Sequence, residues 1–279
     1  MRRYARRWPR SRLREVGEDD FRVTVHDRRP AASVTQAPAP RLGHVRLFLL
    51  LLLSADLAFV GMHLVHALTP YLGDRLYSLE TDRGYAEMFQ YVKTFWIALL
   101  LGALWWQTRE RAFAAWMLLF GYLLCDDALQ VHEKGGYAVA KLLGLAGAFG
   151  LRAQDLGELA LSAAVGGTLL GAIALLSVRG SRDVRHASLD LTGLLAILVF
   201  FGIVVDMLHV GASGGAAQVA LGTLEDGGEM LAMSAACGYA LRLFERGGSV
   251  PVPLLRMLRT ARQPTEPERA DARRRPSAP

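Results

Sequence analysis

Apolar residues recur along the chain in six long runs separated by polar or glycine-containing links. The runs cover 45–68, 94–106, 112–129, 156–178, 189–210 and 221–243. A membrane-spanning helix needs about 20 predominantly apolar residues, and such a segment must be helical because its backbone groups find no water in lipid. The pattern therefore predicts an all-α, polytopic transmembrane helix bundle with about six spans.

The two ends of the chain differ from this apolar body. Residues 1–43 are rich in arginine and show no apolar period, and residues 246–279 are similarly basic and contain several prolines. Segments of this composition bury too little apolar surface to fold alone. We therefore expect a disordered basic arm at 1–43, a transmembrane domain at 44–245 and a disordered basic tail at 246–279. Within the domain, the weakly apolar segment 135–150 is predicted to form a short interfacial or re-entrant helix.

The net charge of +6 is distributed unevenly. Residues 1–43 carry +6 and residues 246–279 carry +5, whereas residues 44–245 carry −5. Basic residues mark the cytoplasmic ends of spans, so we predict a plasma (inner) membrane protein with both termini in the cytoplasm. The basic tails suit anionic lipid headgroups. Beyond Tyr4 and Trp8, the arginines of the tails lack the interleaved aromatic residues of a nucleic-acid binder, so nucleic acid is not an expected partner. Arginine outnumbers lysine 29 to 3, which is typical of bacteria with GC-rich genomes.

Ionisable residues inside the predicted spans gather on one side of the membrane. Such groups are energetically unfavourable in lipid and are usually functional. Because successive spans alternate in direction, groups late in spans one, three and five meet groups early in spans four and six, in the extracytoplasmic half. These groups are Asp56, His63, His66, Asp126, Asp127, His132, Glu133, Asp155, Glu158, Asp206, His209, Glu225, Asp226 and Glu229. Their convergence predicts a shared site.

Helical spacing refines this site. Asp206 and His209 are three residues apart, a spacing that places two side chains on one helix face. Carboxylates and imidazoles on facing helices build the metal sites of helix bundles, and such ligands suit iron, manganese or zinc. The predicted metal ligands are His63, His66, Asp126, His132, Asp206, His209, Glu225 and Glu229. Asp127 and Glu133 are not needed as metal ligands, and we predict that they act as catalytic bases.

Single members of this set also have structural interpretations. Asp155 and Asp190 precede apolar runs and suit helix N-caps. His66 and Glu133 lie near span ends, where interfacial polar residues are common. A lone intramembrane histidine such as His63 is typical of a hydrogen-bonded core residue. Only the convergence of many such groups favours a functional site.

Two motifs resemble those of a known protein family. The third run ends in Asp126-Asp127, four further residues and His132-Glu133, and residues 225–230 follow the pattern acid-acid-x-x-Glu-Met. Together they resemble a family of uncharacterised bacterial polytopic membrane proteins with an Asp-(Asp/Glu)-x4-His-Glu motif and a C-terminal acid-acid-x-x-Glu-Met motif. The resemblance covers roughly 45–245. It implies the fold and the site and supplies no reaction. Membrane hydrolases of the ceramidase type share intramembrane His and Asp, but their C-terminal His-x-x-x-His pair is missing here.

Three functions fit these residues. The first is a metal-binding membrane protein, a candidate metal-dependent enzyme acting on lipid or quinone-like substrates. The second is a proton- or cation-coupled transporter, because intramembrane acids and histidines also build ion pathways. The third is a structural or assembly subunit in which polar groups only hold helices together. The predicted cytoplasmic halves carry almost no charge, which favours the first function over the second.

Overall fold

The computed structural model describes residues 42–148, 152–210 and 214–250. The regular elements in these ranges are α-helices, one 3-10 turn and one π-helical turn, so the all-α prediction is confirmed. In chain order they are α1 (Leu42–Leu68), η1 (Arg75–Tyr77), α2 (Tyr85–Thr108), α3 (Arg111–Leu129), α4 (Val131–Leu143), α5 (Ala153–Arg179), α6 (Arg182–Val199), η2 (Phe200–Val205), α7 (Asp206–Val210) and α8 (Gly215–Glu245). The predicted arm and tail lie almost entirely outside the described residues.

Five helical segments in the described part of the chain are long and apolar enough to cross a membrane. They are Gly43–Leu68, Tyr85–Thr108, Arg111–Leu129, Ala153–Arg179 and Arg182–His209. The protein is therefore a multi-pass membrane protein set in a lipid bilayer. The predicted sixth span lies within α8, which is 31 residues long but is not among the five. Its acidic residues Glu225, Asp226 and Glu229 lower its hydropathy, and it packs against α1, α2 and α6.

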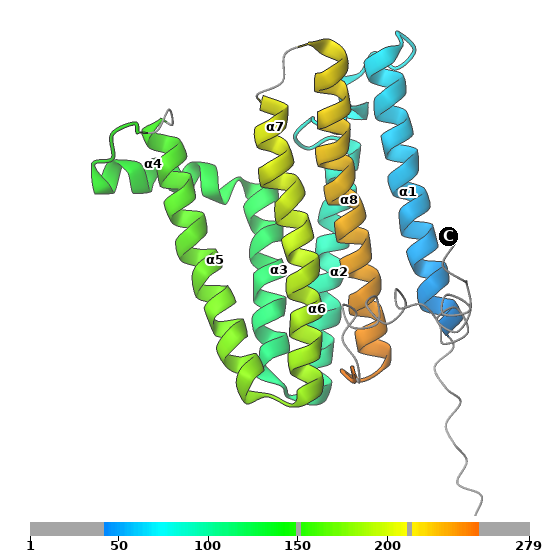
Figure 1. The fold of residues 1–279 in the computed structure, drawn as a ribbon, viewed down its shortest axis with the longest axis vertical. Coiled ribbons are helices and arrows are strands. Elements are labelled where there is room, and N and C mark those ends of the chain that lie inside the picture. Colours follow the sequence, from blue (N-terminus) through cyan, green and yellow to red (C-terminus); the bar gives the residue numbers. More distant parts are fainter. Residues whose placement is uncertain (1–41, 149–151, 211–213, 251–279) are drawn as a thin grey trace, which may run out of the picture. The chain divides into compact units, whose positions relative to one another are not determined.

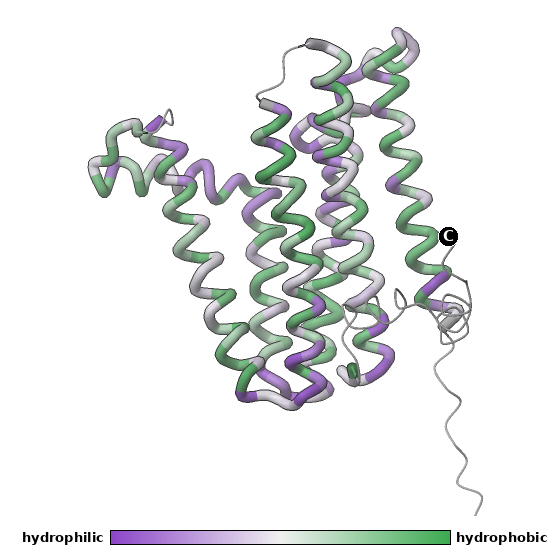
Figure 2. The backbone as a smooth tube through the Cα atoms, viewed as in Figure 1, coloured by the Kyte–Doolittle hydropathy of each residue, from purple (hydrophilic) through white to green (hydrophobic). Residues whose placement is uncertain are grey.

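The long helices pack side by side, with α8 at the centre of the contacts (Figure 1). Helix α8 touches α1, α2, α6, η2 and α7, while α2 packs along α3 and α3 packs against α5. The largest fully buried side chains include Trp116, Phe113 and Phe120 of α3, which form the apolar core with residues of α2 and α8. Figure 2 shows hydrophobic residues covering most of the long helices and hydrophilic stretches near their ends.

Two element boundaries differ from the sequence prediction. Helix α2 begins at Tyr85, well before the predicted start at 94, because the polar residues of its first turns find partners inside the bundle. The segment predicted as a short helix at 135–150 is α4, which covers Val131–Leu143. It starts directly after Gln130, whose left-handed backbone (φ 54°) ends α3 and turns the chain.

A π-helical turn interrupts the fifth long apolar segment, Arg182–His209. Residues Phe200–Val205 form η2 between α6 and α7, and η2 packs against α8. A π-turn inserts one extra residue into a helix, and such turns are frequent at functional sites. The insertion rotates every later side chain by about 100°, so η2 sets the direction in which Asp206 and His209 of α7 point.

Candidate functional site

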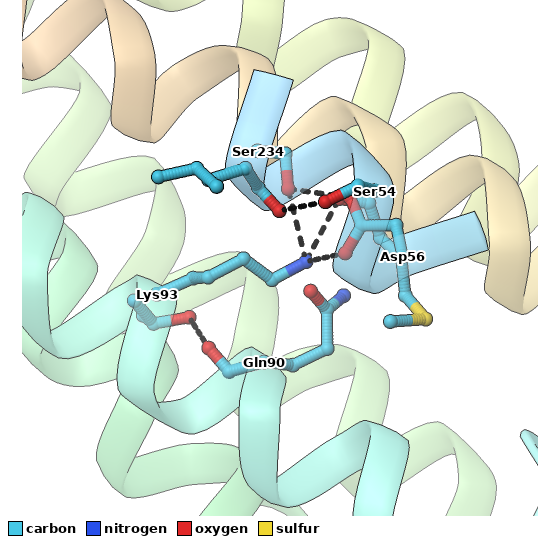
Figure 3. Close-up of polar contacts among 8 residues, drawn as sticks. Ser54, Asp56, Gln90, Lys93 and Ser234 are labelled. Atoms are coloured by element: carbon cyan, nitrogen blue, oxygen red, sulfur yellow. Dashed lines mark hydrogen bonds and ion pairs between the residues drawn. The ribbon is translucent and has the colours of Figure 1, made fainter. Parts of the chain in front are cut away.

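A fully buried ion pair joins α1 to α2 (Figure 3). The ammonium of Lys93 lies 2.9 Å from Oδ1 of Asp56, and both side chains have no exposed surface. The same ammonium donates to the carbonyl of Met230 at 2.9 Å and to Oγ of Ser234 at 3.3 Å. Ser234 in turn donates to Oδ2 of Asp56 at 2.5 Å. Three helices are thus tied together by one balanced polar network.

The sequence prediction included Asp56 and missed Lys93. A buried charge is costly unless it is paired and hydrogen-bonded, and Lys93 supplies both the charge and the bonds that Asp56 needs. The Phe89 ring lies 5.0 Å from the ammonium and adds a cation–π contact. A lone lysine beside a predicted span, with a lone aspartate in another span, was the signal that could have found the pair.

An acidic cavity of about 60 Å³ adjoins this ion pair. Its walls come from the η1–α2 region and from α8, and they are Leu79, Ala86, Glu87, Gln90, Asp226, Glu229 and Met230. Three of these residues are acids and none is basic. Met230 belongs both to the cavity wall and to the ligands of the Lys93 ammonium. The carbonyl oxygen of the Gln90 side chain is buried without a hydrogen-bond partner.

Small residues of η2 and α8 let the helices close around Glu229. A Cβ atom placed on Gly202 of η2 would strike the carboxylate of Glu229, and one placed on Gly228 would strike the ring of Phe201. At Gly227 the nearest atom would be Cγ2 of Val60, at 3.4 Å. Gly202 and Gly228 are therefore needed for close approach, and they bring the π-turn against Glu229.

A histidine–carboxylate pair lies at the same end of α8. Nδ1 of His209 is 2.8 Å from Oε2 of Glu225, and Asp206 lies within electrostatic range of the same carboxylate. The Glu80 carboxylate and Cε1 of His209 both lie beside the Cα of Gly222. Glu80, in the link between η1 and α2, is a member of this acidic end that sequence reasoning did not select.

The first motif folds into a second histidine–carboxylate pair. Oδ1 of Asp126 accepts the backbone N–H of His132 at 2.8 Å. Nδ1 of His132 lies 3.1 Å from Oδ2 of Asp126 but without hydrogen-bond geometry. Glu133 accepts a weak bond from Gln130 at 3.4 Å. Asp126 thus ties the end of α3 to the first turn of α4.

Tyr91 connects this motif to the cavity. Its hydroxyl donates to Glu87 at 2.5 Å and also lies 3.3 Å from the backbone carbonyl of Asp127. The backbone N–H of Arg83 bonds the other oxygen of Glu87. The Asp127 side chain itself is exposed. Of the two predicted bases, Asp127 thus lies closer to the cavity acids, within electrostatic range of Glu87 and Glu229.

The two histidines of α1 have other partners. Nδ1 of His63 accepts the backbone N–H of Leu79 at 3.2 Å, which places the proton of the neutral ring on Nε2, and that nitrogen is buried without a hydrogen-bond partner. Nδ1 of His66 lies 2.6 Å from the carbonyl of Leu72 and must donate to it. Both histidines fasten the link after α1, which is the structural interpretation of such residues.

The predicted ligands therefore come together in pairs rather than in one metal centre. Asp126 joins His132, and Glu225 joins His209. In the described ranges no three His, Cys, Asp or Glu side chains are grouped closely enough to hold a metal ion. The predicted gathering of acids takes the form of a cluster around Asp226. The carboxylates of Glu80, Glu87 and Glu225 lie close enough to Asp226 to interact with it electrostatically. A bound iron, manganese or zinc ion stays a prediction, as do the catalytic roles of Asp127 and Glu133.

The chain belongs to the family defined by a domain of unknown function, DUF8692, whose family model matches residues 44–243. The match covers all but the first two and last two residues of the helical region, which runs from Leu42 to Glu245. A comparison with curated proteins found no match, and neither did one with solved structures.

Proposed function

We propose that this DUF8692 membrane protein binds a cation in the acidic cavity and acts as a proton- or cation-coupled carrier. One observation supports this above all: Glu87, Asp226 and Glu229 line one cavity that no basic residue lines. Carboxylates that share a small space repel one another, and a bound cation or proton relieves that repulsion. Intramembrane acids of this kind are typical of ion pathways.

The coupling ion is a proton or a cation that keeps part of its water. No three potential ligands among the described residues are grouped for direct metal coordination. A polar cavity of about 60 Å³ has room for ordered water, which needs only about 10–15 Å³ of such space per molecule. Three separated carboxylates and the free oxygen of Gln90 suit this looser binding.

The buried ion pair is the proposed coupling element. The backbone carbonyl of Met230 accepts a hydrogen bond from the Lys93 ammonium, and the same residue lines the cavity. A cation bound in the cavity would repel the positively charged Lys93 ammonium and weaken its hydrogen bond to Met230. This repulsion is effective because the protein interior screens charges poorly. Occupancy of the cavity would then alter how α1, α2 and α8 are tied together. This answers the argument from sequence that the cytoplasmic halves of the spans carry almost no charge, because coupling through helix movement needs no chain of charged groups across the bilayer.

The sidedness of the carrier follows from the charge pattern. Basic residues lie in both tails, in the link with Arg109 and Arg111, and in the link with Arg179, Arg182 and Arg185. By the positive-inside rule these parts lie in the cytoplasm. The cavity then faces the extracytoplasmic side, since η1 and the start of α2 follow the first outward span. We propose that ions reach the cavity from that side.

Purified protein in proteoliposomes tests this function. Uptake of protons, Na⁺, Mg²⁺ and Mn²⁺ is followed with internal indicator dyes, in wild type and in the double variant Asp226→Asn/Glu229→Gln. We expect flux of at least one of these ions in wild type and background flux in the double variant. Glu110→Gln is the matched control, because Glu110 lies at the start of α3, outside the cavity lining. Wild-type flux no higher than that of empty vesicles for all four ions would reject the carrier.

A metal-dependent enzyme is a second candidate, favoured by the contact of His209. A metal-ligating histidine usually passes its other N–H to a carboxylate, and Nδ1 of His209 faces Glu225 in this way. We expect stoichiometric iron, manganese or zinc in purified protein on this hypothesis, with loss of the metal in His209→Ala. Metal content that is low, or unchanged by His209→Ala, would leave the carrier as the better proposal.

The two motifs that resemble those of the bacterial membrane protein family belong to the same proposed site. Asp226 and Glu229 of the acid-acid-x-x-Glu-Met motif line the cavity. The Asp-Asp-x4-His-Glu motif approaches it through the Tyr91 bridge between Glu87 and Asp127. We propose that both motifs serve one ion-binding end of the bundle.

A further inference from the structure

We propose that a pocket between α4 and the start of α5 binds the headgroup of an anionic phospholipid. The pocket measures about 400 Å³ and lies away from the acidic cavity. Its lining consists of Tyr137, Ala140, Lys141, Leu145, Arg152, Ala153 and Gln154. This binding is independent of the carrier function, because no lining residue is shared between the two cavities.

The charge of the pocket suits a phosphate group. Lys141 is exposed, and it has no ion-pair partner among the residues that the structure describes. Arg152 is 79% exposed and pairs with Asp155 at 2.7 Å. The lining thus contains two cations and no acid. Of the two acids next to it, Asp155 pairs with Arg152 and Glu158 accepts a hydrogen bond from Gln154 at 2.8 Å. Lys141 remains available for an anion.

The position of α4 places this pocket at the membrane surface. Figure 1 shows α4 running across the direction of the long helices, at the end of the bundle where α3 ends and α5 begins. Helix α4 buries Gly136 and Ala140. A Cβ on Gly136 would strike Glu158 of α5, so the two helices are in backbone contact there. A helix in this position with one apolar side lies in the interface between headgroups and acyl chains.

Apolar side chains beside the pocket select a lipid over a soluble anion. Leu142 is 84% exposed, Leu143 is 61% exposed and Tyr137 is 62% exposed. Helix α5, which forms the other wall, has only 6% of its apolar window buried inside the protein. Acyl chains cover such surfaces, while the headgroup phosphate lies against Lys141. Tyrosine is also common at this depth of the membrane.

Site-specific crosslinking tests the proposal on the full chain. Protein in mild detergent is incubated with phosphatidylglycerol that carries a photoactivatable diazirine, and labelled peptides are identified by mass spectrometry. We expect label in the peptides that cover 137–154. Lys141→Gln should lower that label about fivefold, the factor expected for one basic residue beside an anionic headgroup. Because the label is mapped to peptides, lipid bound at the basic tails is counted separately.

The matched control is Lys134→Gln, on the same helix but outside the pocket lining. The Lys134 ammonium donates to the carbonyl of Leu129 at 2.7 Å. Label that is unchanged in Lys134→Gln and reduced in Lys141→Gln supports the site. Equal loss in both variants, or no label in 137–154, would overturn it. Protection by inorganic phosphate as strong as by unlabelled phosphatidylglycerol would identify a phosphate site and overturn the lipid proposal.

Discussion

Two polar regions meet at Met230 and differ in charge balance. On one side, the Lys93–Asp56 pair is neutral as a unit, fully buried and completely hydrogen-bonded by Met230 and Ser234. On the other side, the cavity holds three acids, no base and an unpaired oxygen of Gln90. The same helices, α2 and α8, contribute to both regions.

This difference separates a structural network from a binding site. A buried pair with all of its partners leaves nothing for a ligand to satisfy, and it fixes the packing of the helices that it joins. A cavity with like charges and an unpaired oxygen needs a bound cation, proton or water to neutralise the charges and to donate a hydrogen bond to the oxygen. Function is therefore expected in the unbalanced region, and damage to folding in the balanced one.

Removal of Lys93 should have the largest effect on stability. Lys93→Met leaves Asp56 buried and unpaired, and we expect a loss of about 3–5 kcal/mol in the free energy of unfolding. The double variant Asp56→Asn/Lys93→Met should recover most of that loss, because no charge is left unpaired. Glu229→Gln, in the unbalanced region, should lower stability little or raise it. Denaturant unfolding in detergent, followed by tryptophan fluorescence, measures all three variants. If Lys93→Met were as stable as wild type, the balanced network would have no structural role.

Removal of the Ser234 hydroxyl should have an intermediate effect. Ser234→Ala deletes the bond to Oδ2 of Asp56, and hydrogen bonds to charged groups contribute about 1.5–3 kcal/mol. The same unfolding measurement reports the loss. Ser181→Ala serves as a comparison, since Ser181 caps α6 and does not contact the pair. A smaller loss at Ser234 than at Ser181 would mean that Asp56 is satisfied by Lys93 alone.

A methyl group at Gly228 should have the smallest effect on stability and a specific effect on binding. Gly228→Ala presses on the Phe201 ring, and such overpacking costs about 1–3 kcal/mol. Because the added methyl group displaces η2 beside Glu229, the increase in unfolding temperature on adding the cation should also become smaller. Gly227→Ala, one residue away, meets its nearest atom at 3.4 Å and should be tolerated better. Thermal unfolding with and without cation compares the pair. Equal behaviour of the two variants would show that η2 does not shape the cavity.

The apolar pattern predicted the helices well because lipid leaves the backbone no alternative to a helix. Five of the predicted runs correspond to long apolar helices. The exceptions involve polar residues whose partners are far away in the sequence. Lys93 is 37 residues from Asp56, so hydropathy excluded it from span two although it is fully buried. Asp190, interpreted as a helix cap, instead lies inside α6 and accepts a bond from Tyr239 at 2.9 Å.

The candidate site was predicted in outline and not in detail. Alternating span direction predicted that these acids and histidines share one end of the bundle, whereas the individual pairs, His209 with Glu225 and Asp126 with His132, come from the structure alone. It could not reveal the π-turn before Asp206, which depends on how Gly202 and Gly228 let helices approach. Nor could it select Glu80 and Glu87, which lie before and within the first turn of α2 in a stretch that hydropathy assigns to a link.

The dependence of stability on bound cation tests the central proposal most directly. The unfolding temperature of purified protein is measured against pH and against Na⁺, Mg²⁺ and Mn²⁺, in wild type and in Asp226→Asn/Glu229→Gln. We predict that one cation, or protons as the pH falls, stabilises wild type, by about 2.7 kcal/mol at a concentration 100 times the dissociation constant. The double variant should show no such dependence. An identical response of wild type and double variant would contradict cation binding in the acidic cavity.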